Sequence, residues 1–299
     1  MAISATVPQE TLHIPAAYGA LPSHWAWARL DDFCNGVYDC PHSTPRLTST
    51  GPYVVRTQDI ATGTFRPEQA ARVSDETFLE RTTRATPRYG DLLYSREGTY
   101  FGVAAEVPKG FQVCLGQRMV LIRPNPRLID FRYLCYWLNS PLMATHIHGF
   151  RDGSVAERLN LPTIRSLPVV VPSLAEQRSI ASTLRVLDDK VEWNRRVASL
   201  LSDLVSTSFT DLITRYREYE PLSTLATFHK GVSYRSADLS PSTTAMVTLK
   251  SFDRNGGYKQ NGLKQFVGKY KPEQKVDPGE LVVAQTDLTQ AAEVVGQWP

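Results

Sequence analysis

Cysteine and histidine are the residues of this sequence that could hold a transition metal. The cysteines share no C-x-x-C spacing, and they are Cys34, Cys40, Cys114 and Cys135. The densest group, Cys34, Cys40 and His42, could be joined by His146 and His148, because zinc prefers thiolate and imidazole ligands. Thiols kept reduced inside a cell are the simpler interpretation of such irregular spacing. We therefore predict no metal site.

Nucleophilic and nucleotide-binding chemistry would need motifs that this sequence lacks. It contains no G-x-x-x-x-G-K-[ST] loop, no G-x-G-x-x-G turn and no G-x-S-x-G elbow. The segment Asn125-Pro126-Arg127-Leu128 lacks the second proline and the aromatic residue that an adenine methyltransferase would show. Glu273, Lys275 and Asp277 resemble a nuclease cluster only faintly, and a solvated charged loop explains them better. We predict no catalytic residue, which favours a binding module.

The charge is balanced, and arginine supplies most of the positive side chains in the first half. The 299 residues carry 33 Lys and Arg against 30 Asp and Glu, a net charge of +3, and 42% are hydrophobic. The planar guanidinium fork suits bidentate contacts with guanine edges and phosphate. A nucleic-acid surface would therefore depend on placed arginines rather than on excess charge. No apolar run approaches the roughly 18 residues of a membrane span, and no basic-apolar leader begins the chain, so we expect a soluble, cytoplasmic protein.

Short apolar runs bounded by glycine and proline predict the strands that must position such side chains. The predicted strands lie at residues 92–95, 103–106, 119–122 and 168–171, and a predicted helix lies at 131–138. Because strands and helix are mixed in this way, we expect an α+β domain over residues 1-172.

The chain also repeats itself at an interval of about 190 residues. The strand-like segments 53–60 and 245–252 correspond, and so do segments 89–96 and 278–285. Because the matches keep the same order and nearly the same interval, we predict one complete repeat and the opening of a second over residues 218-299.

A long helix is predicted over residues 173-217, where Ser173 and Glu176 form a capping box at its start. It should run from Leu174 to about Tyr216, roughly 60 Å at 1.5 Å per residue. Spacings of three and four residues then alternate as in a coiled-coil seam, with Asn194 setting the register of a partner helix. The predicted interface residues are Ile180, Leu184, Leu187, Val191, Asn194, Leu201, Val205 and Leu212. A lone core helix of one globular domain is the alternative.

The residues around this helix start resemble the specificity subunits of type I restriction-modification systems. The resemblance lies in Leu167-Pro-Val-Val-Val-Pro172, then Glu176-Gln177 and Ile180-Ala181, then Leu187-Asp188-Asp-Lys190 and Asn194. Residues 153–161 also resemble the segment that closes a target-recognition domain in that family. The resemblance extends over nearly the whole chain, and its helix motif is the specific part.

The resemblance implies an α+β fold with a β-rich target-recognition domain (1-172), a coiled-coil spacer helix (173-217) and a partial second target-recognition domain (218-299). It implies that the chain binds double-stranded DNA without being an enzyme, and that methyltransferase subunits and a restriction/translocase subunit are its partners. S-adenosylmethionine, ATP and Mg are then expected on those partners, and no cofactor is expected on this chain. Because the sequence ends inside the second repeat, a homodimer through the spacer helix is a further expectation.

Base-edge contacts in such a domain are expected from side chains on loops beside the sheet. The candidates are Arg56, Gln58, Ser95, Arg96, Arg118 and Arg151 in the first repeat, and Lys250, Arg254 and Gln285 in the second. Arg96 and Gln285 are the preferred pair, because each follows a Gly-Asp/Glu-Leu strand. Two alternatives stay open: the specificity region of a fused or two-component methyltransferase-nuclease, and a coiled-coil adaptor without DNA readout.

Overall fold

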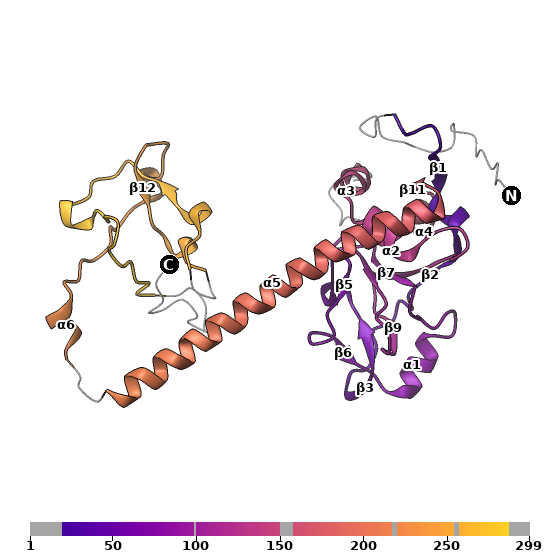
Figure 1. The fold of residues 1–299 in the computed structure, drawn as a ribbon, viewed down its shortest axis with the longest axis horizontal. Helices are drawn as coiled ribbons and strands as arrows, with labels where there is room; N and C mark the ends of the chain where they lie inside the picture. Colours follow the sequence, from indigo (N-terminus) through magenta and orange to yellow (C-terminus); the bar gives the residue numbers. More distant parts are fainter. Residues whose placement is uncertain (1–19, 99, 150–157, 217–219, 254–256, 287–299) are drawn as a thin grey trace. The chain divides into compact units, whose positions relative to one another are not determined.

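The computed structural model of the chain describes residues 20–98, 100–149, 158–216, 220–253 and 257–286 (Figure 1). Its internal contacts divide it into two units, Met1–Leu204 and Val205–Pro299, and each is described by itself. A β-rich domain followed by one long helix, α5 (Leu174–Arg215), confirms the predicted α+β fold class. The assignment of residues 218-299 to a partial second recognition domain stays a prediction.

An antiparallel sheet in the order β2-β10-β7-β8 is the framework of the first unit. Its strands are β2 (Cys34–Asp39), β10 (Met119–Pro124), β7 (Leu92–Ser95) and β8 (Ala104–Glu106). Successive side chains of a strand point to opposite faces, and both faces of this sheet are covered. Leu92 and Tyr94 pack in one apolar cluster, whereas Leu93 packs in another. Burial on both faces explains why the two central strands, β7 and β10, are nearly continuous apolar runs in the sequence.

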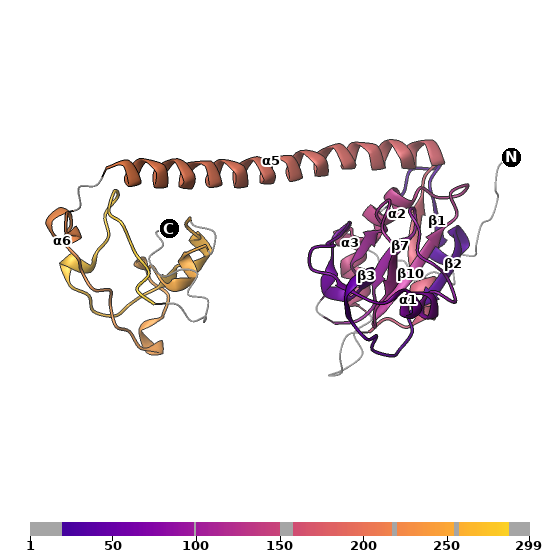
Figure 2. The same cartoon turned by 90° about the horizontal axis from the view of Figure 1, so that it is seen from below.

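Helices cover the face to which Leu92 and Tyr94 contribute. They are α2 (Phe131–Leu138), α3 (Pro141–His148) and α4 (Leu161–Arg165), joined by the antiparallel ribbon of β1 (Ala26–Arg29) and β11 (Pro168–Val171). Figure 2 shows α2 between this sheet and the start of α5. Pro141 begins α3, where a proline in the first turn needs no N–H partner.

A smaller sheet packs on the other side of the framework. Strand β3 (Thr48–Val55) pairs antiparallel with β6 (Ala71–Arg72) and parallel with β9 (Val113–Leu115). The short hairpin of β4 (Ile60–Ala61) and β5 (Thr64–Phe65) and the helix α1 (Asp75–Arg81) complete this side. Phe65, Leu93 and Leu115 belong to its apolar cluster.

The predicted strands at 92–95 and 168–171 and the predicted helix at 131–138 are confirmed as β7, β11 and α2. The predicted strand at 53–60 is wrong beyond Val55. There Asp59 donates its N–H to Arg56 O (3.0 Å) and closes a 3-10 turn, and Asp59 Oδ2 caps the turn by accepting the N–H of Arg56 (2.9 Å). The predicted strand at 245–252 is also too long, because β12 ends at Met246 and a 3-10 turn again follows.

The second unit has little regular structure among its described residues. It contains α6 (Leu222–Leu225) and the antiparallel pair β12 (Ala245–Met246) and β13 (Lys264–Gln265). Its small apolar cluster centres on Phe252 and Ala284. With so few buried side chains, we expect this unit to contribute little stability of its own.

One turn of the first unit recurs in the second at the predicted interval. Arg88 donates its N–H to Asp91 Oδ2 (3.0 Å), and Asp277 donates its N–H to Glu280 Oε2 (2.8 Å). Gly90 and Gly279, inside the two turns, both have positive φ (93° and 96°), which glycine adopts without steric cost. This shared geometry supports the predicted repeat.

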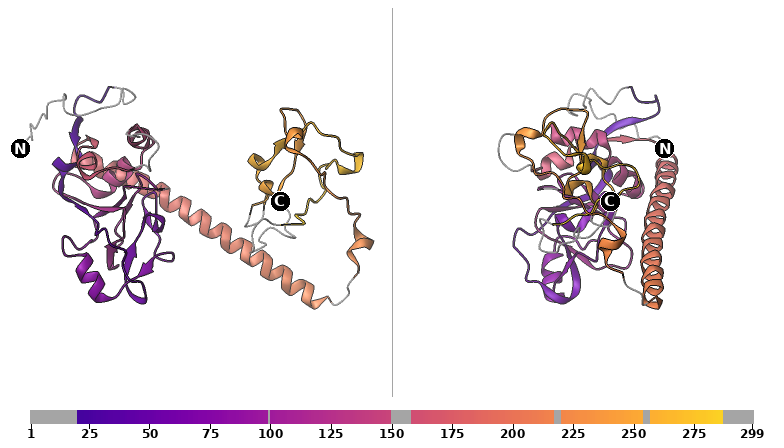
Figure 3. Two further views of the ribbon diagram at one scale, coloured as in Figure 1. Left: turned by 180° about the vertical axis from the view of Figure 1, so that it is seen from behind. Right: turned by 90° about the vertical axis from the view of Figure 1, so that its left-hand side faces the viewer.

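The predicted capping box at the start of α5 is confirmed. Ser173 Oγ accepts the N–H of Glu176 (3.4 Å), and Glu176 Oε2 accepts the N–H of Ser173 (3.0 Å). Glu176 Oε1 also lies 2.9 Å from His24 Nε2 and accepts from Trp25 Nε1 (3.3 Å). These contacts attach residues 24 and 25 to the helix start. Figure 3 shows the ribbon of the first unit from two further sides. Among the described residues, no helix is both long enough and apolar enough to cross a bilayer.

Replacing Glu176 with glutamine is expected to lower the thermal unfolding midpoint at pH 7 and to have little effect near pH 2. The hydrogen bonds from Ser173 and His24 lower the pKa of Glu176 from 4.5 to about 2. A carboxylate with a lowered pKa stabilises the fold above its unfolded-state pKa, and this contribution is lost as the pH falls from 4.5 to about 2. Circular dichroism melts of both proteins across this range measure the difference. If the difference between the two unfolding midpoints stays the same at low pH, the ionised Glu176 carboxylate is not what stabilises the helix start.

Candidate nucleic-acid interface

The ends of several strands meet around residues 116–118, the loop that joins β9 to β10. Gly116 donates its N–H to Val55 O at the end of β3 (2.7 Å). Arg96, directly after β7, donates its N–H to Arg118 O (3.0 Å). The sheets fix the backbone here, while the loop can present side chains to a ligand. The structure thus brings together four predicted site residues: Arg56, Ser95, Arg96 and Arg118.

Gln117 and Arg118 are the exposed residues of this loop, and Arg118 is its only cation. Its φ is 67°, in the left-handed region that residues other than glycine rarely adopt. Its side chain is 57% exposed, and its Nε lies 3.3 Å from Glu97 Oε1. Arg158, which is equally exposed, places its Nε 4.0 Å from Glu97 Oε2. Strained backbone concentrates at functional positions, and here it holds a guanidinium group at the surface.

Ser95 and Arg96 lie beneath this surface. The Arg96 side chain is 4% exposed, and its Nη1 lies 3.3 Å from Asp39 Oδ1. Ser95 is fully buried, and its Oγ donates to Glu97 O (3.5 Å). In this structure the fold encloses the Arg96 side chain beneath the loop, so Arg118 is the more accessible arginine of the two.

Arg56 is partly exposed, but its guanidinium fork is occupied. Its Nε and Nη2 donate to the two oxygens of Asp59 (2.9 Å each), and Nη2 also donates to Gln69 O (3.2 Å). The hydrogen bonds to Asp59 raise the pKa of Arg56. Gln58, in the same turn, is exposed. Gln58 is thus the more accessible of the two for a ligand.

Four further candidates for DNA contacts lie either in the second unit or outside the described residues. Lys250 and Gln285 are exposed in the second unit. Arg151 and Arg254 lie outside the described residues. The selection of all nine candidates as DNA contacts stays a prediction.

Arg81 of α1 supports the 116–118 loop from inside the domain. Its Nε and Nη2 donate to Leu115 O (3.0 and 2.8 Å). Its Nη1 donates to Ser43 O (3.0 Å), and Nη2 reaches Pro41 O (3.3 Å). The sequence gives no sign of this role, because Arg81 occupies the last turn of a short helix like an ordinary surface cation.

The predicted interface residues of α5 follow two patterns of exposure. Ile180 and Leu184 are half-buried at the helix start, and the exposed members are Leu187, Val191, Asn194, Leu201, Val205 and Leu212. A neighbouring apolar stripe was not predicted, and it consists of Val186, Trp193, Leu200 and Leu204, all exposed. Its spacing of seven, seven and four residues is a visible signal in the sequence. The helix thus presents a broad apolar surface.

The cysteines are unsuited to nucleophilic chemistry. All four are free, with Cys34 half-buried and the others buried. Burial raises the pKa of Cys34 to about 12 and that of Cys114 to about 11, so both thiols stay protonated at neutral pH. Within the described parts of the chain, no three His, Cys, Asp or Glu side chains are grouped as ligands for a metal.

A family model described as the type I restriction modification DNA specificity domain matches residues 22–201. This match includes more than half of the chain, from β1 to most of α5. The chain belongs to the type I restriction-modification DNA specificity family. The resemblance predicted from the helix motif is thereby confirmed.

Known members of this family are similar over part of their length. The putative type I restriction enzyme MjaX specificity subunit of Methanocaldococcus jannaschii is 27% identical over 86 residues, 29% of this chain and 20% of that protein. The EcoBI specificity subunit of Escherichia coli is 25% identical over 180 residues, 57% of this chain and 38% of that protein. The solved HsdS subunit from Thermoanaerobacter tengcongensis aligns with a TM-score of 0.45 and 18% identity, over 67% of this chain and 52% of that one. The chain spans less than two thirds of the length of each of these relatives.

Proposed function

We propose that the chain is a non-catalytic DNA sequence-specificity subunit of a type I restriction-modification complex, reading half of a bipartite target. The family match over residues 22–201 carries the proposal, because it includes the β-rich domain and the helix that follows it. The exposed guanidinium groups of Arg118 and Arg158 support it. Such groups can donate paired hydrogen bonds to guanine O6 and N7, or to phosphate.

The second part of the proposal is that α5 is the scaffold for the rest of the complex. Exposed apolar side chains along a long helix favour packing against partner helices. Methyltransferase subunits would dock there, a restriction/translocase subunit would join them, and a second copy of this chain could pair through the seam. S-adenosylmethionine, ATP and Mg would be bound by those subunits, and the complex would act on DNA in the cytoplasm.

Selection from random-sequence duplexes, bound at low salt and then washed at increasing salt, tests DNA reading. We expect one enriched motif, because base contacts persist when the salt-dependent phosphate contribution is weakened. Self-association without any enriched motif would indicate a coiled-coil adaptor instead.

Two further assays test the remaining parts of the proposal. Incubation of the chain and DNA with labelled S-adenosylmethionine should give no methyl transfer above background, and transfer would point to a catalytic chain. Size-exclusion chromatography with light scattering should show a dimer at high concentration. A monomer at every concentration would reject the homodimer.

A further inference from the structure

The first turn of α5 is attached to the domain through Gln177, a polar side chain that is completely buried. Its Nε2 donates to Pro172 O (2.9 Å) and Leu128 O (3.4 Å), and its Oε1 accepts the N–H of Asp130 (2.8 Å). Asp130 is also the N-cap of α2, where its Oδ1 accepts the N–H of Arg132 (3.0 Å). Gln177 therefore links the start of α5 directly to the start of α2.

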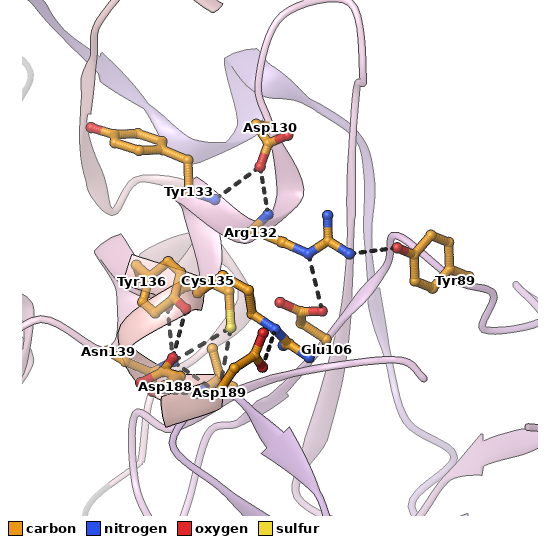
Figure 4. A network of polar contacts seen from close by, with 12 residues as sticks. Tyr89, Glu106, Asp130, Arg132, Tyr133, Cys135, Tyr136, Asn139, Asp188 and Asp189 are labelled. Carbon is orange, nitrogen blue, oxygen red and sulfur yellow. Dashed lines mark hydrogen bonds and ion pairs between the residues drawn. The ribbon is translucent and has the colours of Figure 1, made fainter. Parts of the chain in front are cut away.

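A second attachment joins the same two helices farther along. Tyr136 of α2 donates its hydroxyl hydrogen to Asp188 Oδ2 of α5 (2.6 Å), as Figure 4 shows. Burial and the bond to Asp188 raise the pKa of Tyr136, so the hydroxyl remains a donor at any physiological pH. Between Gln177 and Asp188 the helix rises roughly 16 Å. Ala181, buried in the apolar cluster of the domain, lies between these attachments.

Charged groups surround the second attachment. Glu106 of β8 lies 3.8 Å from Arg132 Nε on α2, and Arg132 also donates to Tyr89 Oη (2.7 Å; Figure 4). Burial raises the pKa of Glu106, while Arg132 and Arg185 of α5 oppose that shift. Asp130 of α2 and Asp188 of α5 act in the opposite direction, so Glu106 interacts with charges of both signs on the two helices. Arg185 is held in turn by Asp189 (3.0 Å).

Two attachments separated along a helix resist tilting, whereas a single one would act as a pivot. A tilt of about 10° would move the far end of a 42-residue rod, roughly 63 Å long, by about 10 Å. That displacement equals about three steps of 3.4 Å along DNA. We infer that Gln177 and Tyr136 are positioning residues that fix the angle at which α5 leaves the recognition domain, and thereby restrict which half-site separations the protein accepts. The restriction on half-site separation rests on the proposed DNA-reading function.

The angle is measured directly by distances between two spin labels in the full-length chain. Glu68→Cys on the domain and Arg196→Cys on α5 are exposed positions within the first unit. Buried native cysteines and the protonated Cys34 should not react, and unsubstituted protein checks this. We expect a narrow distance distribution in the otherwise unaltered chain, and one at least twofold wider with Tyr136→Phe or Asp188→Ala. Tyr100→Phe, an exposed tyrosine outside the network, is the matched control and should leave the width unchanged.

Gln177→Met is the stronger variant but removes buried hydrogen bonds and could fail to fold. Tyr136→Phe deletes only one hydroxyl, so it keeps the inference testable. The two attachments, at Gln177 and at Tyr136–Asp188, are together called the clamp. Identical distance distributions in Tyr136→Phe, Asp188→Ala and the unaltered chain would show that the clamp does not fix the angle of α5.

Selection from DNA duplexes tests whether the angle of α5 restricts the accepted distance between two half-sites. Libraries carrying two copies of the selected half-site at variable separation, bound at a concentration where the chain is dimeric, should yield one separation for the unaltered chain and two or three for Tyr136→Phe, with the same half-site sequence. A wider distance distribution with unchanged separations would overturn the link to spacing. An enriched half-site without any preferred separation in the unaltered chain would also overturn the link to spacing. If the unaltered chain enriches no motif, the proposed function fails, while the spin-label distances still decide whether the clamp exists.

Discussion

Replacing Arg118 with glycine is expected to weaken binding to the selected DNA motif by about 5- to 150-fold, the equivalent of 1–3 kcal/mol for one bidentate base contact, while the fold stays intact. Arg118 is exposed on the loop where the strand ends meet, and its φ is 67°. Glycine adopts this conformation without strain, whereas alanine does not. Arg118→Gly should therefore unfold at a temperature equal to or above that of Arg118→Ala, although both lose the same side chain.

Fluorescence anisotropy titrations and thermal melts of the two variants measure these effects separately. Arg127→Ala removes another exposed arginine outside the loop and should bind as the unaltered chain does. If the loss for Arg118 is confined to one base position, the residue reads sequence. A uniform loss on all duplexes would make it a phosphate contact. Unchanged binding on every duplex would remove Arg118 from the interface.

The elements of this fold that depend on local patterns could be predicted from the sequence. Apolar runs between turn residues located β7 and β11, because strands buried on both faces need no polar alternation. The pair Ser173 and Glu176 located the start of α5, because a capping box involves only residues three apart.

The 3-10 turn at Arg56 was mistaken for strand, because residues 53–60 are rich in β-forming side chains. What decides the conformation is one carboxylate, Asp59, which accepts the N–H of Arg56 and hydrogen-bonds its side chain. Local propensity is a weak prior when a side chain can satisfy the backbone in another way.

The candidate site depends on contacts between residues far apart in the sequence, and these could not be predicted. Arg96 and Arg118 are both arginines beside predicted strands, yet Asp39 holds the first inside the domain while a positive φ holds the second at the surface. The contacts of Gln177 could not be predicted either, although its motif, Glu176-Gln177, is recognisable in the sequence. Its purpose becomes visible only when Asp130, 47 residues earlier, is found bonded to it.

Replacing Arg81 with methionine is expected to destabilise the first unit by about 3 kcal/mol or more, because it takes the donors from three backbone carbonyl groups. Arg81 is 7% exposed as a residue, and its guanidinium group donates to Leu115 O, Ser43 O and Pro41 O. Methionine keeps most of the side-chain volume, so the loss reflects hydrogen bonds rather than a cavity. For a unit of this size the unfolding midpoint should fall by roughly 6–12 °C.

Arg81→Met should also bind DNA more weakly, because Leu115 immediately precedes the loop that carries Arg118. At temperatures where Arg81→Met is still folded, its DNA affinity should be lower than that of Arg84→Met, which removes an exposed arginine three residues away. If Arg81→Met does not fold, Arg81→Lys retains one donor group, and it should unfold at an intermediate temperature. A midpoint for Arg81→Met within about 2 °C of the unaltered chain, well under the shift expected for 3 kcal/mol, would show that the three carbonyl groups find other donors and that α1 does not hold the loop.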